Sequence, residues 1–230
     1  MDSLRGIISD LHVFLYGGVR TLPLTLAGAM TILGLFTANY AMMFFLVGFL
    51  VITPLASSLL NSFADLLTTV FGWDLFKTKT ADICNVVIPY STLSNPSKVE
   101  NAAILCTSSF AMICFFIGYM MTNAVALYQQ PADQNADPSK VSNRTSRAIL
   151  AIVSIAVFAI IMIGFRMYAG CEPMIGLVLG TILFLALGYG WYTMLSQASQ
   201  GRLADVFGIS NRLLPSTATA PVACIVDPSA

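Results

Sequence analysis

The sequence predicts an all-α membrane protein with about five transmembrane helices, or alternatively four, plus interfacial amphipathic helices. Of the 230 residues, 57% are hydrophobic and only 10% are charged, against roughly a quarter charged in an ordinary soluble domain. The mean hydropathy is +0.81. Stretches without any charged residue, long enough to cross a bilayer, recur along the chain at residues 21–64, 101–132, 148–165 and 173–201.

The first uncharged stretch is predicted to fold back on itself. Its 44 residues would form a helix of about 66 Å, twice the hydrocarbon thickness of about 30 Å. We place the turn near Asn39, which interrupts an apolar run and gives a hairpin over residues 21–60, with spans at about 21–37 and 40–60. Pro54 is expected to bend the second span unless neighbouring groups satisfy the freed carbonyl. If one half of the hairpin is re-entrant, the total becomes four spans.

The third span is predicted over residues 101–128. Ser97 and Glu100 precede it at the spacing of a capping box, in which each side chain satisfies a free backbone amide. A polar loop over residues 129–147 follows. The segment 148–196 then contains the fourth and fifth spans, the fifth beginning at Pro173, where a missing N–H costs nothing.

Besides the 129–147 loop, three segments are expected outside the bilayer. Residues 1–20 form an interfacial amphipathic helix, because apolar side chains recur at helical spacing (Leu4, Ile7, Ile8, Leu11 and Leu15). Residues 61–100 contain a second interfacial helix and an extramembrane loop, and residues 197–230 form an extramembrane tail. With five spans, the Lys and Arg residues divide six to five between the two sides, which leaves the orientation open.

Two features point to helix packing and charge pairing. Gly176 and Gly180 form a G-x-x-x-G pattern, with Gly188 two turns further, so one stripe of the fifth span allows close approach of another backbone. The partner helix belongs either to the same chain or to a second copy. Arg166 and Glu172 flank the turn between the last two spans and are interpreted as an interfacial or loop ion pair.

The cysteines predict free thiols. Their number is odd, and their spacings do not suggest a disulfide framework, so we expect buried thiols in a chain that faces the reducing cytosol (Cys84, Cys106, Cys114, Cys171 and Cys224). Asn143-Arg144-Thr145 matches the N-glycosylation pattern, a triplet that is common by chance.

Composition also argues against several classes of function. The 11 basic residues equal the 11 acidic residues, so no net positive field is available for nucleic acid. The single histidine, His12, and the scarcity of acids within the spans argue against an enzyme, a metal site and a cofactor. The same scarcity argues against a proton or ion relay.

Five short runs in the C-terminal half carry a family resemblance, and their order along the chain is part of it. They are Asn123–Ala132 (NAVALYQQPA), Lys140–Ala148 (KVSNRTSRA), Arg166–Glu172 (RMYAGCE), Gly188–Tyr192 (GYGWY) and Arg202–Leu214 (RLADVFGISNRLL). Together they resemble multi-pass membrane proteins of large icosahedral double-stranded DNA viruses. In the N-terminal half, Asn39-Tyr40 and Thr53-Pro54 show a weaker resemblance to the same proteins.

The resemblance implies a minor capsid membrane protein of a virion. Such a protein would lie in the internal membrane beneath the capsid, and in a host membrane during assembly, and would contact lipid and capsid or other virion membrane proteins. The glycine stripe leaves self-association open as a further contact. The tail either lies on the headgroups or binds such a partner through a short amphipathic run, with contacts from Arg202, Asp205, Phe207, Arg212 and Leu213. A small ion channel or transporter is the alternative function.

Overall fold

The computed structural model describes residues 18, 21–71, 84, 105–130, 138–199 and 203–206. Within these ranges the protein is helical and contains no strand, which confirms the all-α class. In chain order the elements are a helix at Thr21–Phe36, α2 (Tyr40–Val47), the π-helix η1 (Gly48–Ile52), α3 (Thr53–Phe71), α4 (Ser108–Gln129), α5 (Pro138–Ala169) and α6 (Met174–Ser199).

Four helices of the described part are long and apolar enough to cross a membrane. They are Tyr40–Val70, Ser108–Gln129, Val141–Ala169 and Met174–Ser199. The Thr21–Phe36 helix is also apolar, but at 1.5 Å per residue it is about 24 Å long, less than the hydrocarbon thickness of about 30 Å. The protein is therefore a multi-pass membrane protein with four long helices, and a shorter helix stands where the first of five spans is predicted.

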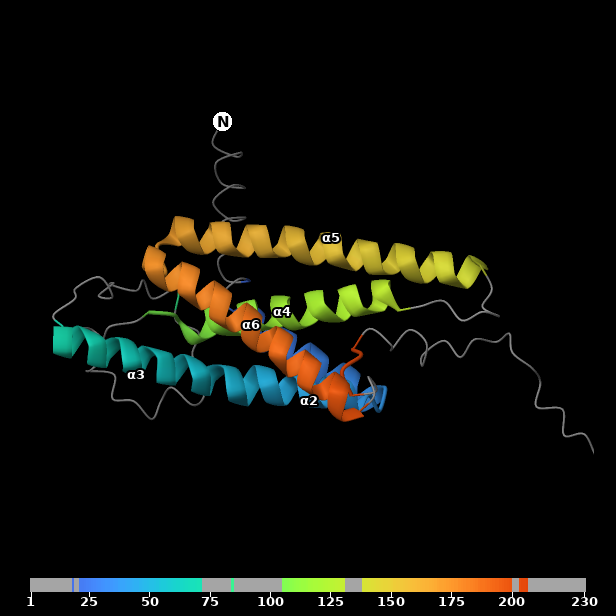
Figure 1. The fold of residues 1–230 in the computed structure, drawn as a ribbon, viewed down its shortest axis with the longest axis horizontal. Coiled ribbons are helices and arrows are strands. Elements are labelled where there is room, and N and C mark those ends of the chain that lie inside the picture. The colour runs from blue at the N-terminus through green and yellow to red at the C-terminus, as the bar shows by residue number, and fades with distance from the viewer. Residues whose placement is uncertain are drawn as a thin grey trace, which may run out of the picture.

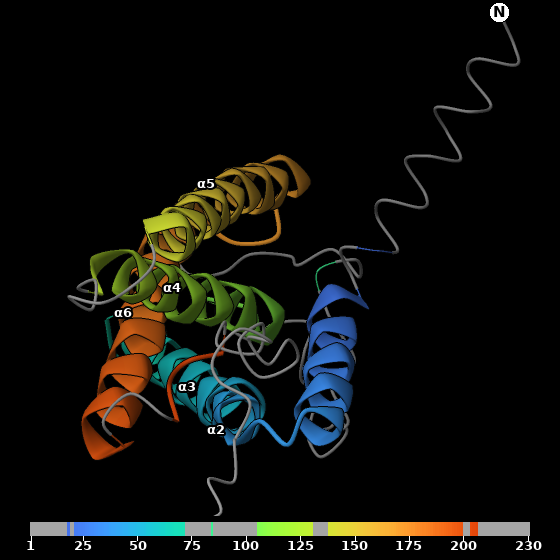
Figure 2. The ribbon, with the colours of Figure 1, turned by 90° about the vertical axis from the view of Figure 1, so that its right-hand side faces the viewer.

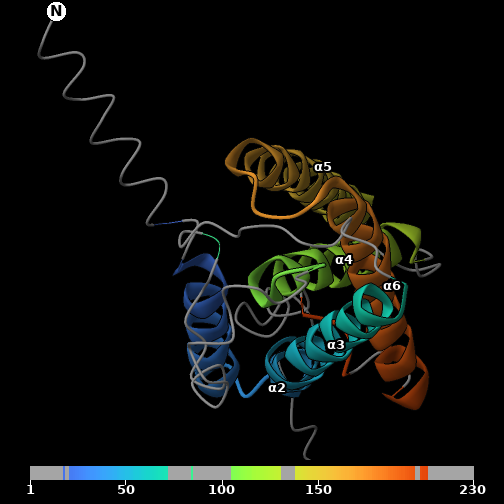
Figure 3. The same cartoon turned by 90° about the vertical axis from the view of Figure 1, so that its left-hand side faces the viewer.

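Helix α4 occupies the centre of the bundle. Figure 1 shows α2–α3 and α5 running in one direction along the long axis, and α4 and α6 returning in the other. In the end-on views, α3, α5 and α6 surround α4, and the Thr21–Phe36 helix stands beside α2 (Figures 2 and 3). Most residues of α4 from Ser109 to Met120 are buried, whereas α5 and α6 expose large apolar side chains along much of their length. These outer faces are compatible with contact with lipid.

The bundle has two ends, which we name by their contents. The disulfide end contains Cys84, the segment 105–108 that leads into α4, and the turn 170–173 between α5 and α6. The tail end contains the turn before α2, the end of α4, and residues 203–206 after α6. In Figure 1, α3 extends beyond its neighbours at the disulfide end, and α5 does so at the tail end.

The fold-back occurs where the sequence predicts it. Ala38 adopts a left-handed backbone conformation with φ of 48°, and Asn39 caps α2 by accepting a hydrogen bond from the N–H of Ala41 at 3.0 Å. The buried Asn39 backbone N–H donates to the carbonyl of Gly34 at 3.0 Å. The polar groups of the buried Asn39 are therefore satisfied within the turn itself.

Pro54 is accommodated by the π-helical turn that precedes it. Over Gly48–Ile52 the hydrogen-bond ladder widens, and the Thr53 N–H donates to the carbonyl of Gly48. The Thr53 hydroxyl donates to the same carbonyl at 2.8 Å. These two hydrogen bonds to the Gly48 carbonyl let the helix continue through the proline into α3, so Tyr40–Phe71 forms one continuous long helix.

Three predicted boundaries differ from the structure. The helix of the second span does not end at residue 60 but continues to Phe71, because α3 packs on the bundle through Ala64 and Thr68. The apolar side chains expected to form the second interfacial helix are instead exposed on the outer face of α3 (Phe63, Leu66 and Val70). Helix α4 begins at Ser108 rather than at 101, because the Thr107 side chain caps it by accepting from the Phe110 N–H. Helix α5 begins at Pro138, so residues 138–147 of the predicted polar loop are helical.

Several predictions lie outside the described residues. They are the amphipathic helix within residues 1–20, the capping box of Ser97 and Glu100, and the tail beyond Val206.

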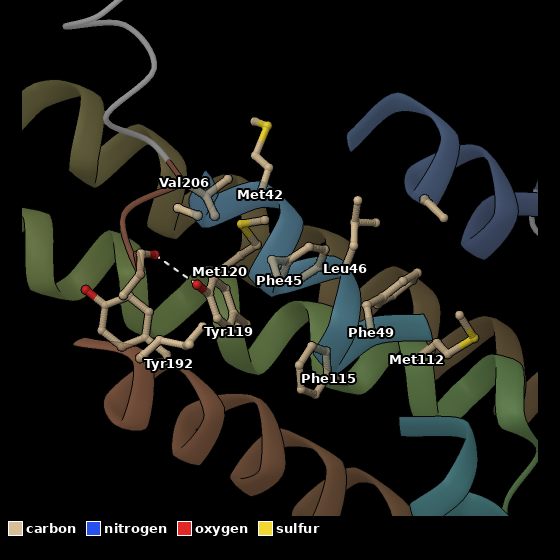
Figure 4. Close-up of a cluster of buried hydrophobic side chains, with 14 residues drawn as sticks. Met42, Phe45, Leu46, Phe49, Met112, Phe115, Tyr119, Met120, Tyr192 and Val206 are labelled. Carbon is tan, nitrogen blue, oxygen red and sulfur yellow. Dashed lines mark hydrogen bonds between the residues drawn. The ribbon is translucent and has the colours of Figure 1, made fainter. Parts of the chain in front are cut away.

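The tail-end half of the core is aromatic. Phe45 is fully buried and packs against Phe49, Phe115 and Tyr119, with ring centroids 5.5, 5.9 and 5.0 Å away. Tyr119 in turn meets the edge of Tyr192 from α6, at 5.4 Å. Figure 4 shows these rings filling the space between α2, α4 and α6. Stacked and edge-to-face ring pairs add roughly 0.5–1.5 kcal/mol each beyond the apolar area that they bury.

Candidate functional site

The most unusual cluster in the described residues is a buried ion pair at the disulfide end. Arg166, in the last turn of α5, contacts Glu172 in the following turn, with the Nη1 and Oε1 atoms 3.2 Å apart. Their side chains are 4% and 0% exposed, respectively. The sequence analysis paired these two residues, but as interfacial or loop groups. The structure instead buries both, because segments distant in the sequence cover them.

Two hydroxyl groups at the start of α4 complete the cluster. The Thr107 hydroxyl donates to Glu172 Oε1 at 2.6 Å and lies 3.3 Å from Arg166 Nη1. Arg166 Nη2 donates to the Ser109 hydroxyl, and the guanidinium carbon lies 5.8 Å from the centroid of the Phe110 ring. Arg166 Nε and Glu172 Oε2 have no hydrogen-bond partner among the described residues. The pair is therefore compensated in charge but only partly satisfied in hydrogen bonding.

Opposing effects act on the Glu172 carboxyl. Burial raises its pKa above the ordinary value, while the Arg166 guanidinium and the Thr107 hydrogen bond pull the pKa downward. The geometry, with a guanidinium and a hydroxyl both on Oε1, stabilises the ionised form. The pair is therefore a salt bridge.

A disulfide lies at the same end of the bundle, so the prediction of free thiols is wrong for two of the cysteines. Cys84 and Cys171 are bonded, across a sequence separation of 87 residues. The bond joins the segment after α3 to the turn that carries Glu172. The Cys84 carbonyl also accepts a hydrogen bond from the Ser109 hydroxyl at 3.2 Å, so the disulfide and the ion pair share a neighbour. Cys106 and Cys114 are free and buried, as expected, and Cys224 lies outside the described residues.

Asn61 on α3 holds the segment that leads into α4, a role that the sequence did not indicate. Its Oδ1 accepts from the N–H groups of Leu105 and Cys106 at 3.0 and 3.1 Å, and its Nδ2 donates to the Cys106 carbonyl at 2.8 Å. The Ser57 hydroxyl donates to the same carbonyl at 3.3 Å. The non-helical backbone before α4 is thus satisfied by side chains of a neighbouring helix.

The glycine stripe of α6 packs against α4 and its preceding segment within the same chain. A Cβ on Gly176 would clash with the Leu105 carbonyl, one on Gly188 would clash with the backbone of Phe115, and one on Gly180 would lie 2.9 Å from the Cys106 thiol. The partner of this glycine stripe is therefore a segment of the same chain. Gly118 of α4 faces the Leu185 backbone in the same way, which extends the close contact to both helices.

The predicted tail begins at residue 197, but residues 197–199 belong to α6, and residues 203–206 pack onto the bundle. Ala204 and Val206 are buried in the aromatic core, and the Tyr119 hydroxyl donates to the Ala204 carbonyl at 2.9 Å (Figure 4). Of the candidate partner contacts, Asp205 lies in this docked segment and is partly buried. Arg202, Phe207, Arg212 and Leu213 lie outside the described residues.

The cluster at the disulfide end is built to hold helix ends together. Among the described residues, no three His, Cys, Asp or Glu side chains are grouped so that they could bind a metal ion. No known protein family, curated protein or solved structure matches this chain.

Proposed function

We propose that this protein is a structural membrane protein of a virion, which anchors the capsid shell to the internal lipid membrane and assists assembly. The virion setting rests on the resemblance of the five C-terminal runs to membrane proteins of large icosahedral double-stranded DNA viruses. Lipid, a capsid or other virion membrane protein and further copies of the chain are the proposed partners.

The observation that best supports a structural role is how closely the helices of the described bundle approach α4. Backbone contacts at Gly118 and Gly188 bring α6 against α4, and a backbone contact at Gly176 brings α6 against the segment that leads into α4. A disulfide and an ion pair join the helix ends at one side, and aromatic packing joins them at the other. An anchor requires a rigid body that transmits force between two layers, and this packing provides one.

One observation favours the alternative of a small channel or transporter. The Arg166–Glu172 pair is buried and leaves two polar atoms without partners among the described residues, as ion-pathway groups sometimes do. The pair nevertheless lies at the helix ends, and the spans carry no Asp, Glu, Lys or Arg in their central parts. We therefore favour the structural role.

Fractionation of purified particles tests the proposal. We expect the protein in purified virions, released by detergent together with capsid protein and not with the soluble core. Its absence from particles would contradict the proposal. Reconstitution in liposomes tests the alternative separately: ion flux that Glu172→Gln abolishes and Gly190→Ala leaves unchanged would favour a channel.

A further inference from the structure

The disulfide and the distribution of basic residues together give the protein an orientation in the membrane. Five spans divide the Lys and Arg residues six to five, but four spans divide them less equally. If the short Thr21–Phe36 helix does not cross, Arg5 and Arg20 are on the same side of the membrane as the tail end, and the division becomes seven to four. By their places in the sequence, this side then has these two residues together with Lys140, Arg144, Arg147, Arg202 and Arg212.

Of the four basic residues on the side of the disulfide end, only three can influence the orientation of the protein in the membrane. Arg166 is buried and neutralised by Glu172, so it is not available to hold this end on one side of a membrane. Only Lys77, Lys79 and Lys98 remain in the connection between α3 and α4. Since the side with more Lys and Arg in short connections faces the cytosol, the charge pattern places the tail end there.

The disulfide gives an independent indication of the same orientation. A cystine forms when an oxidant accepts two electrons and two protons leave the thiols, and protein disulfide oxidants of the secretory compartment perform this role. Cys84 and Cys171 lie at the end with fewer basic residues. Cys106 and Cys114, which are buried between helices, remain free thiols.

We infer that the protein is inserted with its disulfide end in an oxidising compartment and its tail end, with the polar start of α5, in the cytosol. This orientation is independent of the virion role, since it rests on charge and cysteine chemistry alone. In this orientation Asn143 of the glycosylation triplet faces the cytosol and stays unmodified, a point that the sequence left open.

Expression of the full chain with sealed endoplasmic-reticulum microsomes tests the orientation. Pro96 blocks the triplet Asn95-Pro96-Ser97, so Pro96→Ala creates a glycosylation acceptor in the connection at the disulfide end. We expect this variant to gain one glycan, which Asn95→Gln in the same chain removes. The native protein and its Asn143→Gln variant should migrate identically. A glycan on Asn143 would overturn the orientation.

Cysteine labelling decides the outcome even when neither acceptor is modified. Ser142 is exposed on the polar start of α5, so Ser142→Cys in a Cys224→Ser background provides a reporter at the tail end. A membrane-impermeant maleimide should label this thiol in intact microsomes, while Cys84 and Cys171 resist alkylation until a reductant is added. Labelling of Ser142→Cys only after detergent, or free Cys84 and Cys171 in the untreated protein, would contradict the proposal.

Discussion

The two ends of the bundle are held together by different kinds of interaction. At the disulfide end, α3, α4 and the α5–α6 turn are joined by a cystine, a salt bridge and side-chain hydrogen bonds from Asn61 and Thr107. At the tail end, α2, α4 and α6 are joined by stacked and edge-to-face rings around Phe45 and Tyr119. A few specific residue pairs hold the disulfide end together, whereas many weak ring contacts hold the tail end together.

This difference follows from what each end must satisfy. The disulfide end contains non-helical backbone and two opposite charges away from water, and each such group destabilises the fold unless it meets one particular partner. The aromatic core contains few polar atoms, so its energy is spread over many weak contacts. Substitutions should therefore be poorly tolerated at the disulfide end and better tolerated among the rings.

The largest expected effect comes from removing one member of the ion pair. Glu172→Leu leaves the Arg166 guanidinium buried without a counter-charge and should destabilise the protein by about 3–5 kcal/mol. Thermal unfolding in detergent measures the loss. The double variant Arg166→Met, Glu172→Leu should recover most of it, because both charges are gone. Equal instability of the single and double variants would show that the charges themselves do not matter.

Loss of the disulfide should come next. Cys171→Ser releases a cross-link spanning 87 residues, which should lower stability by about 2–4 kcal/mol. The measurement is the unfolding midpoint with and without reductant. The native protein should become less stable on reduction, and Cys171→Ser should be insensitive to it. Insensitivity of the native protein would contradict the role of this bond.

The glycine contacts should show a smaller and strictly local effect. Gly188→Leu must displace the backbone of α4 and should cost about 1–3 kcal/mol. Gly190 is a matched control on the same helix, since nothing lies within 4 Å of a Cβ there. Gly190→Leu should unfold like the native protein in detergent. If the two variants are equally stable, α6 does not pack on α4 through this stripe.

The docked tail should give the smallest effect. Tyr119→Phe keeps the ring but removes the hydrogen bond to the Ala204 carbonyl, at a cost of about 1 kcal/mol. Limited proteolysis after α6 should become faster while the unfolding midpoint changes little. Unchanged proteolysis would show that ring packing alone holds residues 203–206.

The docked tail also decides where a truncation can test the proposed anchoring role. A chain cut at Gly201 would lose Ala204 and Val206, which belong to the core. A chain ending at Gly208 retains them. If residues beyond Gly208 bind a capsid partner, this truncation should stay inserted in the membrane and disappear from assembled particles. Normal incorporation would contradict a tail-mediated anchor.

Local signals predicted much of the fold. Asn39 capped the second helix at the expected turn, Pro173 directly precedes α6, and Gly176 and Gly188 of the glycine stripe do approach another backbone. These features depend on residues within a few helical turns of each other. The boundaries at residues 60, 101 and 138–147 were less predictable, because a cap or a packed face decides where a helix ends.

The sequence by itself determined that this protein is a helical, multi-pass membrane protein, because uncharged length and helical spacing are properties of single segments. Only the tertiary structure decided that α4 lies at the centre, that Cys84 bonds Cys171, and that Arg166 and Glu172 are buried. The Thr107 and Ser109 hydroxyls reach Arg166 across 59 and 57 residues. Contacts over such separations depend on how helices pack, and no local pattern in the chain encodes them.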